Sequence, residues 1–314
     1  MRRLVAALAA VVALGPGAQA QDLPKVTIGM SGWTGFAPLS LADKAGIFKK
    51  NGVDVTIKFI PQKDRHLAIA SGDVQCAATT VETFIVWNAN GVPIKQVVQL
   101  DKSYGADGMV VRNSIARIAE LKGKTVAASA PGTAPYFTLA WMLKKNGLSV
   151  KDVKVVNLEP GPAAQAFIAG QNDAAMTYEP YLSTVRDKPD AGKIIATTLD
   201  YPMVMDTFGC TPKFIQENPK LVQALVTSYF EALELIKREP QKSFEIMGSV
   251  VKQTGEQFQK SQAYLRWQDR EANRRFFAGD IQAFSGEAGQ LLLELGIIKS
   301  VPDINAIIDT SFIK

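Results

Sequence analysis

Histidine and cysteine are almost absent from this sequence. One histidine and two cysteines occur among 314 residues, with neither a Cys-x-x-Cys nor a His-x-x-x-His spacing. A protein zinc site needs ligands of these types at such spacings, so we expect no metal and no cofactor. The single histidine, His66, lies in the polar run Lys63-Asp64-Arg65-His66, where a solvated side chain is expected rather than a catalytic base.

Long apolar stretches are lacking as well. Beyond residues 4–14, no segment approaches the roughly 18 uninterrupted apolar residues that a transmembrane helix needs. The run at 4–14 follows two arginines and precedes Ala18-Gln19-Ala20, which is the pattern of a secretory signal peptide. No cysteine lies beside this site to carry a lipid anchor. We therefore expect a signal peptide at residues 1–20, cleaved after Ala20, and a mature protein in the periplasm.

A large excess of charge of either sign is also missing. The formal net charge is +5, and loss of the signal peptide, with its two arginines and no acid, lowers it to +3. Such a small charge gives no indication of nucleic-acid binding. With 47% hydrophobic and 21% charged residues, the composition excludes collagen-like, low-complexity and disordered classes. A chain of 314 residues is expected to divide into about two domains.

The two cysteines, Cys76 and Cys210, both lie in strand-like runs. An oxidising compartment permits a disulfide between them. A chain long enough to bury a large core does not require one, so two buried thiols are the simpler interpretation and a disulfide is the alternative.

Short apolar strands alternate with amphipathic helices in two successive segments. In the first, we predict strands at 26–30, 53–60 and 74–78 and helices at 38–50 and 63–70; in the second, strands at 124–129, 153–158 and 174–177 and helices at 135–145 and 162–169. This β-α-β-α-β order is typical of a parallel sheet covered by helices. The extended runs 107–111 and 201–211 are candidates to connect two lobes. The chain from Asn218-Pro219 onward is predicted to be almost entirely helical, with Leu221, Leu225, Tyr229 and Leu233 as a core-facing row.

The two segments share a short internal similarity. Residues 70–82 resemble residues 169–179, with one gap, and both run from a glycine turn through an apolar strand to Thr-x-Glu. Ligands of open α/β sheets bind beyond the carboxyl ends of the strands. We therefore expect Glu82 and Glu179 to face each other across one cleft.

Five segments, in this order along the chain, resemble periplasmic substrate-binding proteins of ABC importers, in the nitrate, sulfonate, taurine and thiamine-precursor group. The segments are Gly32-Trp33-Thr34-Gly35-Phe36-Ala37-Pro38, Leu41-Ala42-Asp43-Lys44-Ala45-Gly46-Ile47-Phe48, Ala70-Ser71-Gly72-Asp73-Val74, Leu121-Lys122-Gly123-Lys124-Thr125-Val126-Ala127 and Tyr178-Glu179-Pro180-Tyr181.

This resemblance implies an α/β fold of the two-lobed, type II periplasmic binding-protein class, with two hinge strands. Lobe 1 would comprise residues 21–105 and 206–314, and lobe 2 residues 106–205. The resemblance also implies a monomer without enzymatic activity, which closes on a small-molecule ligand and delivers it to a membrane permease.

The acids in the predicted cleft loops indicate the charge of the ligand. These loops contain Glu82, Asp101, Glu179 and Asp206 against the single base Lys102, with no arginine or histidine. Helix N-termini bind anions without any basic side chain, but carboxylates at those positions would repel one. The balance favours a cation, although the helix dipole alone can retain a glutamate near a helix start.

Aromatic side chains on or near the same loops favour a cation too, because a cation is attracted to an aromatic face. Planar guanidinium combines such stacking with N–H donors that match carboxylates. We therefore expect guanidine or a small guanidinium or amidinium compound, and the Gly32-to-Phe36 turn combined with Thr80-Val81-Glu82-Thr83 is similar to transporters that accompany urea and guanidine metabolism. The predicted ligand-binding residues are Trp33, Thr80, Glu82, Asp101, Tyr104, Tyr136, Tyr178, Glu179, Tyr181 and Asp206.

Two alternatives remain open. The first keeps the transport role but replaces the cation with an anion such as an alkanesulfonate, taurine or nitrate. The second is an enzyme similar to those of thiamine-precursor synthesis, against which the scarcity of histidine and cysteine and the export signal both argue. Gly123-Lys124-Thr125 matches only the end of a phosphate-binding loop, because Ile118 stands where that motif needs glycine.

Overall fold

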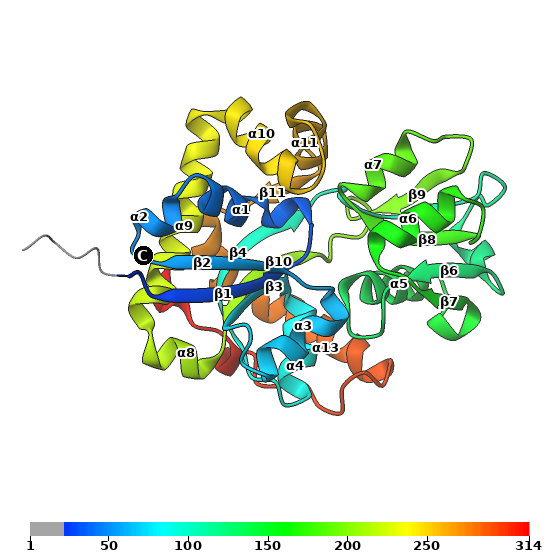
Figure 1. Cartoon of the computed structure of the whole chain (residues 1–314). Coiled ribbons are helices and arrows are strands. Elements are labelled where there is room, and N and C mark those ends of the chain that lie inside the picture. The colour runs from blue at the N-terminus through cyan, green and yellow to red at the C-terminus, as the bar shows by residue number, and fades with distance from the viewer. Residues whose placement is uncertain (1–21, 314) are drawn as a thin grey trace, which may run out of the picture.

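The computed structural model describes residues 22–313. They form two α/β lobes side by side, each built around its own sheet (Figure 1). The predicted signal peptide at residues 1–20 and its cleavage site lie outside the described residues. Within residues 22–313, no helix has the length and apolar character that crossing a bilayer requires.

The sheet of the first lobe has six strands in the order β11-β4-β10-β3-β1-β2. β1 pairs in parallel with β2 and β3, whereas β10 runs antiparallel between β3 and β4. Its strands are β1 (Lys25–Met30), β2 (Asp54–Phe59), β3 (Cys76–Thr80), β4 (Lys95–Ser103), β10 (Met205–Cys210) and β11 (Leu265–Trp267). Its helices are η1 (Thr34–Phe36), α1 (Ala37–Lys44), α2 (Ile47–Lys50), α3 (Gln62–Ala70), α4 (Val81–Ala89), α8 (Pro212–Glu217), α9 (Pro219–Arg238), α10 (Pro240–Val250), α11 (Gly255–Gln262), α12 (Arg270–Arg275) and α13 (Ile281–Glu294).

The sheet of the second lobe has five strands in the order β7-β6-β8-β5-β9. β6 pairs in parallel with β7 and β8, and β5 is antiparallel to β8 and β9. Its strands are β5 (Asp107–Val111), β6 (Thr125–Ala128), β7 (Lys154–Asn157), β8 (Ala174–Tyr178) and β9 (Lys193–Thr197). Its helices are α5 (Ala134–Lys145), α6 (Pro160–Ile168) and α7 (Tyr181–Arg186).

The β-α-β-α-β order predicted for each segment is confirmed. The helix predicted at 38–50 divides into α1 and α2 because Gly46 adopts a φ of 72° between them, a conformation that glycine tolerates. The extended run predicted at 201–211 contains β10, which inserts between β3 and β4. The second half of the chain therefore completes the sheet that the first half begins.

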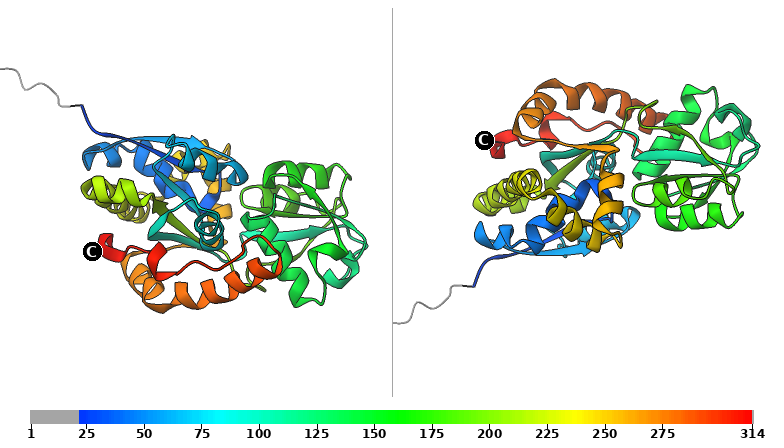
Figure 2. Two further views of the ribbon diagram at one scale, coloured as in Figure 1. Left: turned by 90° about the horizontal axis from the view of Figure 1, so that it is seen from below. Right: turned by 90° about the horizontal axis from the view of Figure 1, so that it is seen from above.

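The C-terminal helices cover both faces of the first sheet. Helix α9 packs its buried Leu225, Tyr229 and Leu233 into the core with α1 and α10, as the sequence predicts. Helix α13 packs on α4 on the other face and reaches the second lobe (Figure 2), where the rings of Phe137 and Phe284 meet at 6.5 Å.

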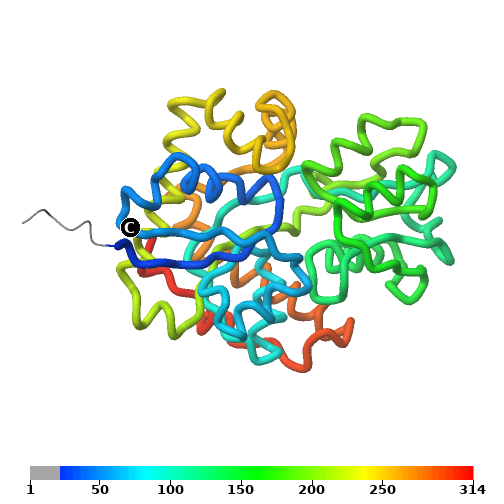
Figure 3. Tube along the Cα trace, viewed as in Figure 1, coloured from blue at the N-terminus to red at the C-terminus, as the bar shows by residue number. Residues whose placement is uncertain are grey.

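The chain crosses between the lobes through residues 104–106 and 198–204 (Figure 3). Next to these crossings, the hydroxyl groups of Ser103 and Thr198 form a hydrogen bond of 2.6 Å. The predicted lobe boundaries, with 21–105 and 206–314 in one lobe and 106–205 in the other, stay a prediction about which segments move as one body.

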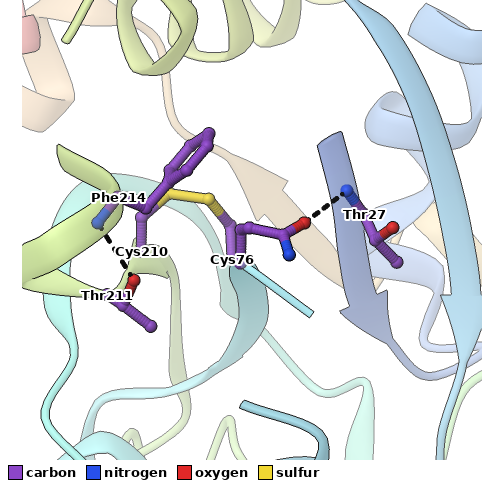
Figure 4. The surroundings of a disulfide bond; sticks show 6 residues. Thr27, Cys76, Cys210, Thr211 and Phe214 are labelled. Atoms are coloured by element: carbon purple, nitrogen blue, oxygen red, sulfur yellow. Dashed lines mark hydrogen bonds between the residues drawn. A yellow bond between two sulfur atoms is a disulfide. The ribbon is translucent and has the colours of Figure 1, made fainter. Parts of the chain in front are cut away.

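A disulfide joins Cys76 of β3 to Cys210 of β10 (Figure 4). The simpler interpretation of two buried thiols was wrong, because antiparallel pairing of these strands sets the two cysteines directly opposite each other. The same register sets Asp206 of β10 opposite Thr80 of β3. The cross-link therefore fixes the strand that carries Asp206 onto its neighbour.

Replacing both cysteines by alanine (Cys76→Ala with Cys210→Ala) is expected to lower the free energy of unfolding by about 2–5 kcal/mol. The physical reason is that the bond restrains a segment spanning 134 positions in the unfolded chain. Urea unfolding of the variant, and of the wild type with and without a reductant, measures the effect. Coincident midpoints for variant and oxidised wild type would contradict the expectation.

Candidate ligand-binding site

A cavity of about 20 Å³ lies between the two lobes. On the same measure, a single water needs about 10–15 Å³, so only a very small solute fits without the lobes separating. The first lobe contributes Ser31, Trp33, Phe36, Gln62, Arg65, Thr79, Thr80 and Asp206, the second contributes Asp107, Ala134 and Tyr178, and Val204 comes from a crossing between them.

Strand direction explains why these side chains meet. β1 and β3 are parallel, so their carboxyl ends lie at one edge of the sheet, and the start of the antiparallel β10 lies at the same edge. Asp206 of β10 is the register partner of Thr80 on one side and of Asp101 on the other. Three polar residues from distant parts of the sequence therefore stand side by side on neighbouring strands.

Four carboxyl groups gather around the cavity at this edge of the sheet: Glu82, Asp101, Asp107 and Asp206. Each of these residues is at most 6% exposed. Oε2 of Glu82, Oδ2 of Asp107 and Oδ2 of Asp206 have no hydrogen-bond partner within the described chain. A buried acceptor without a partner costs free energy. Two of these residues, Asp107 and Asp206, line the cavity, so their free oxygens can accept hydrogen bonds from a ligand.

Burial raises the pKa of all four carboxyl groups, because it removes the water that stabilises their charged form. It raises the pKa of Glu82 to about 8 and that of Asp101 to about 8. Burial and the charge of Glu179 raise the pKa of Asp107 to about 7. Burial, followed by the charges of Asp101, Asp107 and Glu82, holds the pKa of Asp206 well above its usual range.

Two donors offset part of this cost. The hydroxyl of Thr80 donates a hydrogen bond to Glu82 Oε1, which lies in the first turn of α4. Trp33 Nε1 donates to both carboxylate oxygens of Asp101, at 3.1 and 3.3 Å. The indole of Trp33 also meets the ring of Tyr178 from the second lobe edge-on, at 5.3 Å between centroids. Trp33 is therefore both part of the cavity wall and the support of a carboxylate.

Arg65 corrects the expectation that the cleft holds no arginine. It comes from α3, is 1% exposed and lines the cavity. Its guanidinium donates three hydrogen bonds to the carbonyl oxygens of Ile60 and Ala78, leaving two of its five N–H donors for a ligand or solvent. Burial lowers the pKa of Arg65 to about 10, so it remains a cation at neutral pH. The polar run Lys63-Asp64-Arg65-His66 is thus only partly a solvated face.

Four of the ten predicted site residues lie neither in the cavity wall nor directly behind it. Glu179 was predicted to face Glu82, but its carboxylate accepts hydrogen bonds from Arg186 Nη1 at 2.9 Å and from Ser183 N at 3.1 Å. These contacts anchor it to α7, on its own lobe. The other three are Tyr104, which is half exposed beneath the guanidinium of Arg266, Tyr136, which is partly buried outside the cavity wall, and Tyr181, which lines a larger outer groove between the lobes.

The structure brings together the other predicted residues. Trp33, Thr80, Tyr178 and Asp206 line the cavity, whereas Glu82 and Asp101 stand directly behind Thr80 and Trp33. Lys102, the one base predicted nearby, points away to Asp280, at 3.6 Å.

Asp107 and Arg65 were missed by the sequence analysis. Asp107 begins the run 107–111, which was interpreted only as a connection between lobes. A carboxylate at the point where the chain enters the second lobe was the available signal. No local signal marks Arg65, because its role depends on how α3 lies against the sheet. Gly29 of β1 leaves room for it, since a Cβ there would lie 3.2 Å from Arg65 Cγ.

Contacts between the lobes enclose the cavity. Ala134 N, at the start of α5, donates to Gln62 Oε1 at 3.1 Å. Thr34 N donates to the carbonyl oxygen of Glu179 at 3.4 Å, and the guanidinium of Arg186 stacks on the ring of Tyr264 at 4.3 Å. The cavity is thus lined by residues from both lobes, and backbone and side-chain contacts hold the lobes together beside it.

Comparison with known proteins identifies relatives of this chain. The family described as NMT1/THI5 like matches residues 33–243. The taurine-binding periplasmic protein of Escherichia coli is 28% identical over 172 residues, which are 52% of this chain and 52% of that protein.

Solved structures share the fold. The alkanesulfonate-binding protein from Xanthomonas axonopodis pv. citri, bound to MOPS, matches with a TM-score of 0.77 and 18% identity, covering 93% of this chain and 100% of that one. The periplasmic aliphatic sulphonate binding protein from Escherichia coli matches with a TM-score of 0.73 and 18% identity, covering 91% and 98%. The chain therefore has the two-lobed, type II fold of periplasmic binding proteins, as the sequence predicts.

Gly35→Ala is expected to disrupt the support of Asp101. A Cβ at this position would lie 2.2 Å from Trp33 Nε1 and 2.2 Å from Asp101 Oδ2, so one of these buried groups has to move, at a cost of about 1–3 kcal/mol. Gly32→Ala is the matched control, because the atom nearest to a Cβ at this position would be Tyr181 Oη, at an ordinary contact distance of 3.6 Å. Thermal unfolding compares the two, and equal midpoints would contradict the expectation.

The ligand-free protein is expected to lose stability as pH rises from 5.5 to 8.5. In the unfolded chain the carboxyl groups titrate near pH 4, whereas burial raises the folded pKa of Glu82, Asp101 and Asp107 to between about 7 and 8. The folded state therefore holds more protons in this window, and stability falls as they are lost.

Thermal unfolding midpoints across this pH range measure the effect. Asp206→Asn removes one member of the repelling group and is expected to flatten the curve, whereas Glu217→Gln, on the exposed end of α8, should leave it unchanged. A wild-type midpoint that is constant or rises with pH would contradict the expectation.

Proposed function

Since the chain belongs to the NMT1/THI5-like family, we propose that it is the solute-binding component of an ABC importer and that it captures a small planar organic cation. Protonated guanidine is the ligand that fits best. The cation is held between the lobes by buried carboxylates and by aromatic side chains.

The cluster of four buried carboxyl groups is the observation that supports this ligand. Three of their oxygens, on Glu82, Asp107 and Asp206, have no partner within residues 22–313, and a carboxylate buried without a partner is strongly destabilising. Guanidinium carries N–H donors along all three of its edges, and hydrogen bonds from a cation to a carboxylate are among the strongest in proteins. One bound guanidinium would therefore partner oxygens from both lobes.

The size and walls of the cavity agree with a flat, compact ligand. Trp33, Phe36 and Tyr178 supply ring surfaces, over which a cation gains about 0.5–2 kcal/mol. The volume of about 20 Å³ disfavours ligands with long substituents. Within the described residues, no group of three or more His, Cys, Asp or Glu side chains has the arrangement of a metal site, which favours an organic cation.

A ligand with an acidic group is the second candidate. Arg65 supports it, because this buried cation keeps two N–H donors unused at the cavity wall. The names of the relatives agree, since one is a taurine-binding and two are sulfonate-binding proteins. Such a ligand would place its sulfonate on Arg65, and an amino group, where present, on Asp206.

The remaining features follow from the transport role. We propose that the protein acts in the periplasm as a monomer, after removal of residues 1–20, and that it delivers its ligand to a membrane permease. Residues 21–105 with 206–314 would move as one lobe and 106–205 as the other. The relatives compared above are binding proteins rather than enzymes, which supports a role without catalysis.

Binding of guanidinium, methylguanidine, urea, taurine and nitrate to the mature chain tests the ligand, measured as shifts of the thermal midpoint at equal ionic strength. Guanidinium is expected to raise the midpoint at concentrations far below those that unfold proteins. At a 100-fold excess over the dissociation constant, binding stabilises the fold by about 2.7 kcal/mol. A shift with taurine or nitrate and none with guanidinium would replace the first candidate by the second.

Two variants separate the candidates. Asp206→Asn is expected to weaken guanidinium binding by about 30-fold or more, because removing one partner of a buried charge pair costs about 2–5 kcal/mol. Arg65→Gln should leave guanidinium affinity undiminished, whereas it would abolish binding of a sulfonate. Glu217→Gln, on the surface of the first lobe, is the control for both.

A further inference from the structure

We propose that Asp101 and Asp206 hold one proton between them in the empty site and that the bound cation replaces this proton, so that each capture of a cation releases a proton. This inference rests on the cation-binding function proposed above, and it adds an exchange that the family match does not imply.

The geometry of the pair carries the proposal. Asp101 of β4 and Asp206 of β10 are register partners on neighbouring antiparallel strands, and the two carboxyl groups lie close enough for each to shift the pKa of the other. Both residues are at most 3% exposed. An ionised carboxylate only accepts hydrogen bonds, so two carboxyl groups on paired residues can hydrogen bond to each other only if one of them carries a proton.

The surroundings hold the proton on this pair while the site is empty. Three acidic groups face it from other elements: Glu82 on α4, Asp107 on β5 and the hydroxyl of Tyr229 on α9. Two hydrogen-bond donors also face the pair. Neutral Trp33 Nε1 donates to Asp101, and the positively charged guanidinium of Arg65 interacts with Asp206. Arg65 is the one basic side chain among the lining residues, all of which belong to the described chain.

With more acidic than basic groups around the pair, ionising both Asp101 and Asp206 is unfavourable while no ligand is bound. Burial raises the pKa of Asp101 to about 8, and burial together with the neighbouring acids raises the pKa of Asp206 well above its usual range. Tyr229 cannot supply the compensating proton, because its hydroxyl donates to the carbonyl oxygen of Leu100. The positive charge that the site lacks has to come from a proton or from a ligand.

The exchange conserves charge and moves no electrons. A cation that enters beside the unpartnered Oδ2 of Asp206 lowers the proton affinity of the pair. The O–H bond of the protonated carboxyl breaks, its electron pair stays on the oxygen, and the proton passes to water or buffer. Two carboxylates then face one bound cation, and Trp33 remains the donor to Asp101.

Calorimetric titration of the mature wild-type protein with guanidinium chloride tests the exchange. The titration is carried out at pH 6.5 in two buffers of different ionisation enthalpy, because the difference in observed heat gives the number of protons released. We expect close to one proton or more per bound guanidinium at pH 6.5, a number that declines above pH 9. The affinity is expected to rise about tenfold per pH unit between pH 6 and 7.

Two variants assign the proton to the pair. Glu82→Gln removes a neighbouring acid outside the pair and should still release a proton on binding. Asp206→Asn should release fewer protons than the wild type, because an amide opposite Asp101 removes the proton that the two carboxyl groups share. Glu217→Gln is the surface control and should match the wild type in proton number.

The outcomes distinguish this proposal from the function on which it rests. Binding of guanidinium with proton release that disappears above pH 9 supports both. Binding with the same heat in both buffers at pH 6.5 overturns the exchange and leaves the cation-binding function intact. Equal proton release by the wild type and Asp206→Asn overturns the assignment to the pair. Absence of any binding of guanidinium overturns both proposals.

Discussion

Four carboxyl groups buried around one small cavity impose the constraint on which this site depends. In the absence of water, a carboxylate needs a nearby positive charge or a proton. Arg65 supplies one positive charge, and Trp33 and Thr80 supply neutral donors. One positive charge and two neutral donors do not compensate four ionised carboxylates, and both proposals made above start from this shortage. The chemistry of the cavity is thus set by a shortage of positive charge rather than by any single residue.

The fold brings these carboxyl groups together because it places distant segments of the chain at one edge of a sheet. β10 arrives from the second half of the chain and pairs between β3 and β4, which sets Asp206 beside Thr80 and Asp101. The disulfide between Cys76 and Cys210 lies four residues along the same pair of strands. Asp107 comes from the second lobe, so the four carboxyl groups are contributed by both lobes.

The relatives share the architecture but not necessarily the ligand. Proteins named for sulfonates have the same two-lobed fold at 18% identity, a level at which the fold is retained while cavity side chains diverge. A fold positions loops at the ends of strands, and the side chains on those loops determine the ligand. In this chain, acids and aromatic rings dominate those positions, and Arg65 is the single feature that an acidic ligand would use.

Local sequence patterns were enough to predict the strands and helices and six residues of the site. Apolar periodicity predicted both β-α-β-α-β segments, and the rule that ligands bind beyond strand ends nominated Trp33, Thr80, Glu82, Asp101, Tyr178 and Asp206, all of which lie in or directly behind the cavity wall. Apolar periodicity and the ends of strands depend on residues that are neighbours in the chain, so the sequence alone predicts them.

Four features became visible only in the folded chain: the disulfide, the position of Arg65 in the cavity wall, the position of Asp107, and the ion pair that holds Glu179 to Arg186. Each depends on the register between strands far apart in sequence or on how a helix lies against its sheet. Such relations are set by packing of the whole chain, and no short stretch of sequence contains them.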